Sequence, residues 1–263
     1  MLNRSRLRAV LLDMDGVLHR GAVVLPGATE LSTTMVALGL RYACLTNNSS
    51  QLPAIFAGKL AASGITVPVN HIITSSTATA QLLRERFPQG TRLCAIGMAG
   101  VQQALFGDGY FLQDDADVAA VVVGVDFELT YAKLRVATLA LRAGAAFIAT
   151  NADATFPAPE GLIPGAGAIV AALQAASDKV PEVIGKPEPA MFQAALQLLG
   201  VSAEETLMIG DRLDTDIAGA QRAGIATAFV GSGVHSIAEA EAWPTPPDLI
   251  LPDLAAVLAV LRG

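Results

Sequence analysis

Short apolar runs alternate with longer amphipathic stretches along most of the chain. LRAVLLD (7–13) predicts a buried strand and GATELSTTMVALG (27–39) a helix, and RYACLT (41–46) and LPAIFAGKLAASG (52–64) repeat that order. Further buried strands are predicted over 92–97, 118–125, 145–150, 206–211 and 225–230. Repeated strand–helix units are typical of an α/β protein whose parallel sheet is covered on both faces.

Four of the apolar runs end in polar groups. They are LLD, CLTNN, VIGK and LMIGD, near positions 13, 46, 186 and 211. Because a parallel sheet carries its site at the carboxyl ends of its strands, we expect all four runs to be site strands. About 140 residues separate the second run from the third, which leaves room for an inserted α/β domain.

The predicted architecture is therefore a Rossmann-like parallel-sheet core with an inserted α/β domain. We expect the core to comprise residues 1–79 and 181–263, and the insertion to comprise 80–180. Two polar, turn-forming stretches, TSSTAT (74–79) and ASDKVP (176–181), are the candidate hinges.

Composition narrows the class of protein. Hydrophobic residues make up 52% of the chain and charged residues 16%, which is typical of a well-buried globular protein. No apolar run approaches the roughly 20 residues that span a membrane. The net charge of −7 argues against a nucleic-acid partner, although a metal can reverse the sign locally and admit anionic substrates. Cys44 and Cys94 fall in predicted buried strands, so we expect no disulfide and a cytoplasmic protein.

Asp13 and Asp15 follow the first predicted strand and precede Gly16. They could belong to an ordinary Asp turn, or they could be a metal-bound nucleophile with a nearby acid. Two like charges roughly 4 Å apart repel by about 4 kcal/mol at an effective dielectric near 20. A divalent cation removes that penalty and prefers oxygen ligands. Gly16 would let the backbone turn sharply and aim its N–H groups at an anion.

The second and third polar ends carry uncharged donors and a cation. Thr46 and Asn47 form either a turn before a helix or a pair of donors that bind a phosphate oxygen without adding charge. Lys186 is either a surface lysine or a partner for carboxylates and a phosphate. Pro187 and Pro189 restrict the backbone that follows it.

The fourth polar end repeats the pattern of the first. Asp211 follows an apolar strand as Asp13 does, and Asp214 and Asp216 open a helix. We interpret Asp214 as a helix-capping residue. Asp216 could reach the same metal, directly or through water, or it could orient Lys186. Each feature alone is ordinary, but their combination supplies a nucleophile, a second acid, phosphate donors, a cation and metal ligands.

The stretches DMDGVL, LTNN, GKPEP and GDRLDTDI resemble the four motifs of the haloacid dehalogenase superfamily of phosphatases. They are most similar to the NagD and p-nitrophenyl phosphatase-like subfamily (IIA), which has a large C2-type α/β cap between the second and third motifs. VVVGVDFELTYAKL, FIATNAD and IPGAGAIVAAL look like that cap, so the resemblance covers nearly the whole chain.

This resemblance implies a phosphomonoesterase that works through an aspartyl phosphate. Asp13 would be the nucleophile, and Asp15 would protonate the leaving alcohol and then activate water. The implied cofactor is Mg²⁺, held by Asp13, the backbone carbonyl of Asp15, Asp211 and Asp216, the last directly or through water. The implied phosphate ligands are Thr46, Asn47 and Lys186.

The resemblance also assigns substrate choice to the cap. The implied substrate is a small phosphorylated metabolite: a sugar or glycerol phosphate, phosphoglycolate, a nucleoside monophosphate, pyridoxal phosphate or p-nitrophenyl phosphate. Asp126, Asn151 and Asp153 follow predicted cap strands, where they either form turns or read the leaving group. The resemblance further allows a homodimer formed through the cap.

Two rival functions use a similar acidic pocket. A receiver-like signalling module also carries an aspartate that becomes phosphorylated. It is, however, a single domain without the second acid or the long insertion. A dehalogenase attacks carbon and needs neither Mg²⁺ nor an acid at position 15. Asp15 and the acids of the fourth motif favour phosphate monoesters over dehalogenation.

Overall fold

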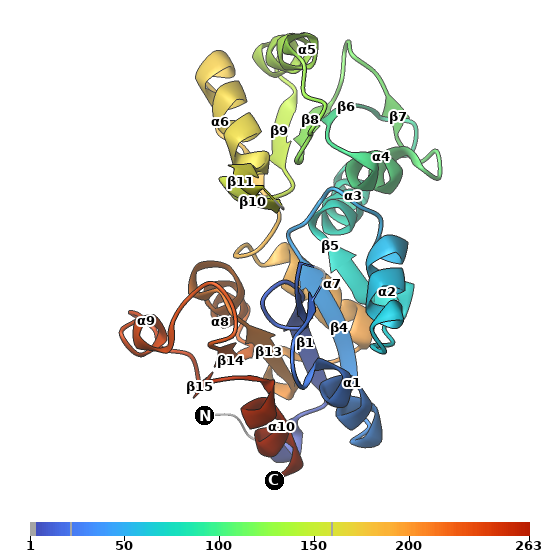
Figure 1. The fold of residues 1–263 in the computed structure, drawn as a ribbon. Helices are drawn as coiled ribbons and strands as arrows, with labels where there is room; N and C mark the ends of the chain where they lie inside the picture. The colour runs from blue at the N-terminus through green and yellow to red at the C-terminus, as the bar shows by residue number, and fades with distance from the viewer. Residues whose placement is uncertain (1–3, 22, 159) are drawn as a thin grey trace. The chain divides into compact units, whose positions relative to one another are not determined.

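The computed structural model describes residues 4–21, 23–158 and 160–263 of the chain (Figure 1). The chain divides into two compact units. The first unit comprises Met1–Thr46, Ala54–Ile73 and Lys186–Gly263, and the second comprises Asn47–Pro53 and Thr74–Gly185. Each unit is an α/β structure built around its own sheet.

The first unit contains a six-stranded sheet with β1 near its centre. The strand order is β15 (Leu249–Leu251), β14 (Ala226–Val230), β13 (Thr206–Gly210), β1 (Ala9–Asp13), β4 (Arg41–Thr46) and β5 (Ile72–Thr74). β1 pairs in parallel with both β13 and β4, which places Leu12 opposite Ile209 and Cys44. All five residues of β1 are buried, as expected for a parallel strand covered on both faces.

Helices cover the two faces of this sheet. On one face, α1 (Ala28–Ala37), α2 (Pro53–Ala62) and α10 (Leu254–Arg262) share a core cluster with Val10 and Leu12 of β1. On the other face, Phe229 packs against the turn η4 (Leu213–Ile217) and α9 (Ile237–Glu241). The remaining elements of this unit are η1 (Arg4–Arg6), β2 (His19–Arg20), β3 (Val23–Val24), η2 (Val69–His71), α7 (Ala190–Leu199), η3 (Ala203–Glu205) and α8 (Ala218–Arg222).

The second unit contains a five-stranded parallel sheet. The strand order is β12 (Glu182–Val183), β9 (Ala146–Ala149), β8 (Ala120–Val123), β6 (Arg92–Ile96) and β7 (Leu112–Gln113). Helices α5 (Tyr131–Arg142) and α6 (Ala166–Ser177) pack together over one core cluster, and α3 (Ser75–Arg86) packs against α4 (Ala99–Phe106) (Figure 1). An antiparallel hairpin, β10 (Thr155–Ala158) and β11 (Gly161–Pro164), precedes α6.

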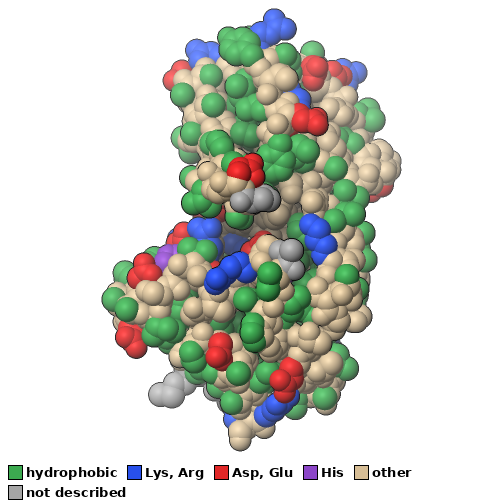
Figure 2. Space-filling model, viewed as in Figure 1, with side chains coloured by type: hydrophobic (Ala, Val, Ile, Leu, Met, Phe, Trp, Pro, Cys, Tyr) green, Lys and Arg blue, Asp and Glu red, His purple; other side chains and the backbone are tan. Residues whose placement is uncertain are grey.

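The α/β class and the parallel core predicted from the sequence are confirmed. The predicted strand 41–46 coincides with β4, and the predicted helices 27–39 and 52–64 contain α1 and α2. None of the helices described in the structure is both long and apolar enough to cross a membrane. Figure 2 shows acidic and basic side chains interspersed over the visible face of the molecule.

The hinge predicted over 74–79 is helical. Thr74 caps α3, because its Oγ1 accepts the Thr77 N–H while the Thr77 hydroxyl accepts the Thr74 N–H. Serines and threonines are typical of turns and of helix N-termini alike, and here the reciprocal capping box begins a helix. The second candidate hinge, 176–181, begins in the last turn of α6 and continues beyond that helix.

From the sequence pattern we expected the run VIGK to end a strand of the first sheet. The structure differs from that expectation. The strand of this run, β12, pairs with β9 in the second unit, with Glu182 opposite Ile148. Ile184 and Gly185 continue to donate hydrogen bonds to Ala149 and Thr150. An apolar run indicates burial but does not specify the sheet in which the strand pairs. Lys186 is thus the first residue after the chain returns to the first unit.

Candidate active site

Three neighbouring strands of the first sheet bring polar groups to its carboxyl edge. β1 ends at Asp13, β4 ends at Thr46, and Asp211 directly follows β13. Because β1 lies between the other two strands, these ends adjoin one another. All three side chains are buried. Burying several polar groups at one sheet edge costs free energy unless each group is paired, so the partners of these residues define the site.

Lys186 is the cation of this edge. Its Nζ donates to Asp13 Oδ1 at 2.5 Å, to Asp216 Oδ1 at 2.6 Å and to the Leu45 carbonyl at 3.2 Å. The Lys186 residue is only 4% exposed. Burial alone would lower the pKa of Lys186, but the two carboxylates outweigh burial and raise it. Lys186 is therefore a buried ammonium between two acids.

Asp211 presents an oxygen to the same place. Its Oδ2 accepts the Val234 N–H at 2.7 Å, whereas its Oδ1 is buried and has no hydrogen-bond partner among the described residues. One carboxylate oxygen from each of Asp13, Asp211 and Asp216 lies within 4.8 Å of the others. When all three carboxyl groups are ionised, they and the Lys186 ammonium carry a net charge of −2. The residues therefore fit a divalent cation that prefers oxygen ligands.

Without such a cation, Asp13 and Asp211 resist ionisation. Burial, then the charge of Asp216, raises the pKa of Asp13 well above its usual range. The same two causes raise the pKa of Asp211 to about 6. Desolvation and like charges both disfavour the ionised form of a carboxyl group. A bound divalent cation would act in the opposite direction, because it favours the ionised form of its ligands.

Asp216 is held by a tight local structure. Besides its bond to Lys186, its Oδ2 accepts the Arg212 N–H at 3.1 Å. The turn η4 is π-helical, with the Ile217 N–H donating to the Arg212 carbonyl five residues earlier, a pattern often found at functional sites. A side chain at Gly210 would overlap Asp216, so glycine is required at the end of β13.

Asp15 differs from the buried acids because its side chain is 49% exposed. Its Oδ1 lies 3.2 Å from Nδ1 of His19. Gly16 adopts a φ of +86°, which favours glycine, and its N–H donates to the His19 carbonyl at 2.7 Å. From the sequence we expected this N–H to point at an anion. Instead it closes the turn after β1. Asp15 is left with one side open to solvent.

Sequence reasoning missed the loop that follows β14, residues 231–235. This loop supplies the Val234 N–H to Asp211, and its Ser232 hydroxyl donates to the Gly16 carbonyl at 2.7 Å. His235 Nδ1 accepts the Leu213 N–H at 3.2 Å. A side chain at Gly233 would overlap the Asp211 carboxylate. The sequence signal for this loop is its position: GSGVH directly follows an apolar strand, as the other site loops do. It contains no acidic residue, which is the feature that identified the loops after β1 and β13.

Asn47, Asn151 and Asp153 lie together in the second unit. Asn47 Nδ2 donates to Asp153 Oδ2 at 3.2 Å, and Asn151 Nδ2 donates to the Asn47 carbonyl at 2.8 Å. Asp126 has other partners: it is buried, bonded to Lys133 Nζ at 2.8 Å, and accepts the Glu128 N–H. Of the three residues that the sequence suggested for the cap, Asn151 and Asp153 thus contact Asn47 of the LTNN motif, and Asp126 is bonded elsewhere.

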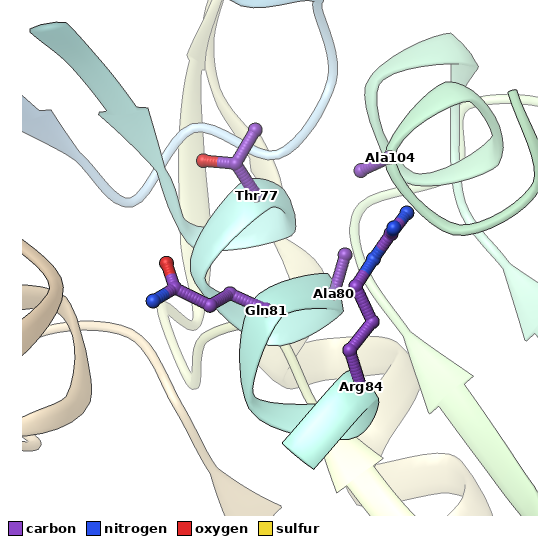
Figure 3. A pocket seen from close by; sticks show the side chains of 5 residues that line it. All are labelled: Thr77, Ala80, Gln81, Arg84 and Ala104. Atoms are coloured by element: carbon purple, nitrogen blue, oxygen red, sulfur yellow. The ribbon is translucent and has the colours of Figure 1, made fainter. Parts of the chain in front are cut away.

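The second unit also has a pocket between α3 and α4 (Figure 3). It is lined by Thr77, Ala80, Gln81, Arg84 and Ala104. The Arg84 guanidinium is engaged with the Asp108 carboxylate at 2.9 Å. These five lining residues include no acid, histidine or cysteine, in contrast to the carboxyl edge of the first sheet.

Comparison with known proteins finds similarity over nearly the whole chain. Residues 10–110 match the family model described as haloacid dehalogenase-like hydrolase, and residues 183–257 match one described as HAD-hydrolase-like. An acid sugar phosphatase of Staphylococcus saprophyticus is 36% identical over 97% of this chain and 98% of its own. A 4-nitrophenylphosphatase structure from Thermotoga maritima has a TM-score of 0.92 at 32% identity, covering 98% of both chains. NagD from Escherichia coli K-12 has a TM-score of 0.88 at 34% identity, covering 95% of this chain and 97% of NagD.

Proposed function

The chain belongs to the haloacid dehalogenase-like hydrolases, as a phosphomonoesterase of the NagD and p-nitrophenyl phosphatase-like subfamily, and from that premise we propose that it is Mg²⁺-dependent and forms an aspartyl phosphate on Asp13. The observation that carries the proposal is the buried cluster in which Lys186 joins Asp13 to Asp216 beside the unpartnered Asp211 Oδ1. Phosphoryl transfer needs mainly positioning and charge neutralisation, and this cluster provides the groups for both.

The proposed metal ligands are chosen by whether each carboxylate oxygen already accepts hydrogen bonds. Asp211 Oδ1, a carboxylate oxygen of Asp13 and the backbone carbonyl of Asp15 would hold Mg²⁺. Both oxygens of Asp216 already accept hydrogen bonds, so we propose that Asp216 acts through water and by holding Lys186. When bound, Mg²⁺ supplies positive charge that offsets the charge developing on the transferred phosphoryl group.

The side chains divide the chemistry between two steps. The Asp13 carboxylate attacks phosphorus, the bond from phosphorus to the ester oxygen breaks, and Asp15 donates its proton to the leaving alcohol. In the second step the Asp15 carboxylate takes a proton from water. The water oxygen attacks phosphorus, which frees Asp13 and releases inorganic phosphate. Thr46, Asn47 and Lys186 would bind the phosphate oxygens throughout.

Substrate class and organisation follow from the same premise. We propose a sugar phosphate as the natural substrate, because several curated relatives are named acid sugar phosphatases, with 4-nitrophenyl phosphate as a surrogate. The second unit, which contains residues 80–180, would form the cap that selects the leaving group, and the first unit would form the catalytic core. The two buried cysteines are unpaired, which supports a cytoplasmic location. The family resemblance is the support for a homodimer through the cap.

Metal removal tests the proposed cofactor. We expect many turnovers of 4-nitrophenyl phosphate per chain in Mg²⁺, and loss of that activity in excess EDTA, because the acids then lack the cation that favours their ionised form. The measurement is release of 4-nitrophenolate over time, with Mg²⁺ added back as the control. Activity that persists in EDTA would refute the metal, and release of a single phosphate per chain would favour a receiver-like module.

Asp15→Asn tests the proposed acid–base residue. An asparagine cannot protonate the leaving alcohol or accept a proton from water, so we expect slow formation of the aspartyl phosphate and still slower hydrolysis. The expected loss in kcat is roughly a hundredfold to ten-thousandfold. Labelling with ³²P substrate followed by acid quenching should trap phosphoprotein in the variant. Turnover at the wild-type rate would show that Asp15 is not the acid–base group.

A further inference from the structure

The contacts of Asn47 give Asn151 and Asp153 a role other than reading the leaving group. We propose that these two residues are positioning residues, which fix Asn47 for binding the phosphate that all substrates share. This inference rests on the proposed function, in which Asn47 binds phosphate. All the residues that carry it belong to the second unit, so the contacts lie within one compact body.

The backbone of Asn47 is anchored from two sides. Its carbonyl accepts Asn151 Nδ2 at 2.8 Å and the Ser75 hydroxyl at 2.8 Å. Asn151 is only 4% exposed, and its Oδ1 accepts the Asp153 N–H at 3.1 Å. Both ends of the Asn151 amide are therefore used inside the protein. A residue that recognises a leaving group must direct a polar group toward the substrate instead.

The side chain of Asn47 is oriented by a charge. Asp153 Oδ2 accepts Asn47 Nδ2 at 3.2 Å. An ionised carboxylate only accepts hydrogen bonds, so it selects the NH₂ end of the amide and fixes which way the amide is turned. The opposite end, Oδ1, lies against Gly185, where an added Cβ would be 2.6 Å away. Gly185 directly precedes Lys186, so Asn47 is packed against the residue that leads into the catalytic lysine.

The loop that carries Asn151 and Asp153 is itself fixed by the start of α6. The Gly167 N–H donates to the Asp153 carbonyl at 2.9 Å. A side chain at Gly165 or Gly167 would overlap the backbone of residues 152–155. The stretch PGAGA (164–168) therefore has a physical role: its glycines let α6 begin directly against this loop. A rigid base of this kind is what a positioning residue requires.

The proposal predicts a defect that is the same for every substrate. We expect Asp153→Ala to lower kcat/KM by roughly tenfold, the size of one lost hydrogen bond to a charged group. The factor should be equal for 4-nitrophenyl phosphate and for glucose 6-phosphate, because one leaving group is an aromatic phenol and the other is a polar sugar. The inhibition constant of inorganic phosphate, which has no leaving group, should rise by a similar factor. Asp153→Asn should restore most of the activity, because its amide oxygen can accept the same bond.

Controls separate positioning from stability and from the activity itself. Asp115→Ala removes an exposed acid of the same unit and should change none of these constants. Asn151→Ala removes the bond from Asn151 Nδ2 to the Asn47 carbonyl. We expect the same result from it, and it replaces Asp153→Ala if that variant does not fold. In an Asn47→Ala background, Asp153→Ala should have little additional effect, because the two residues act through one contact.

Several outcomes would overturn the inference. A change of more than about threefold in the ratio of the two kcat/KM values would return Asp153 to leaving-group recognition, as would an unchanged phosphate inhibition constant. Full additivity with Asn47→Ala would show that Asp153 does not act through Asn47. A wild-type protein that hydrolyses neither substrate would instead refute the proposed function.

Discussion

Asp13→Asn is expected to abolish the turnover of 4-nitrophenyl phosphate, with a loss in kcat of roughly four orders of magnitude or more. An amide cannot form the aspartyl phosphate, and no other described carboxylate is bonded to Lys186 except Asp216, whose two oxygens are already hydrogen-bonded. The measurement is 4-nitrophenolate release at saturating Mg²⁺, with enzyme concentrations high enough to detect a residual rate.

The control for this variant is its stability without metal. Burial and neighbouring acids raise the pKa of Asp13, so the folded protein resists the ionised form of this carboxyl group. A neutral amide of the same size should therefore leave the melting temperature unchanged or slightly higher in EDTA. A folded variant with full activity would show that Asp13 is not the nucleophile. A variant that is inactive and unfolded would shift the test to ³²P trapping on the wild-type chain.

The sequence revealed the parts of the site that lie at strand ends. Asp13, Thr46 and Asp211 each follow an uninterrupted apolar run, and the carboxyl ends of neighbouring parallel strands meet at one edge. That rule depends only on chain direction and burial. It therefore predicted that these polar strand ends adjoin at one edge of the sheet, without any knowledge of side-chain contacts.

Other features depend on which elements pair in three dimensions. The run before Lys186 has the apolar character of a core strand, yet β12 pairs in the second sheet. Asp216 gains its role from bonds to Lys186 and to the Arg212 N–H, and η4 makes a π-helical turn that 3.6-residue periodicity does not reveal. The partner of Asn47 lies 106 residues away in the sequence. Pattern and spacing do not encode such long-range partners.

Lys186→Met is expected to be the most destabilising of the substitutions considered, as well as inactive. The variant removes the ammonium that is bonded to Asp13 and Asp216, two of the three buried carboxylates of this cluster. Breaking a buried ion pair by removing one partner costs about 3–5 kcal/mol. For a chain of this size that corresponds to a fall in melting temperature of roughly 10 °C. The measurement is thermal unfolding in EDTA at pH 7.5, followed by circular dichroism.

The same variant should become more stable as the pH falls. Lys186 lowers the pKa of Asp13 and of Asp211, so removing it raises both pKa values further above that of an unfolded aspartate. A carboxyl group whose pKa is raised on folding binds its proton more tightly in the folded state, so stability increases as pH falls through the folded pKa. With the pKa of Asp211 at about 6 already in the wild type, the recovery should appear between about pH 8 and pH 5.

Lys133→Met is the matched control, because it also removes a lysine 2.8 Å from an aspartate. The Lys133 side chain is 41% exposed, against 3% for Lys186, and the buried Asp126 carboxylate keeps the Glu128 N–H as a donor when Lys133 is removed. We therefore expect a smaller loss than in Lys186→Met, about 1–3 kcal/mol. Equal losses in the two variants would mean that the acids around Lys186 are already neutral in the metal-free protein. A smaller loss in Lys186→Met would show that the three carboxylates do not depend on this ammonium, and would remove the electrostatic basis for placing a divalent cation beside them.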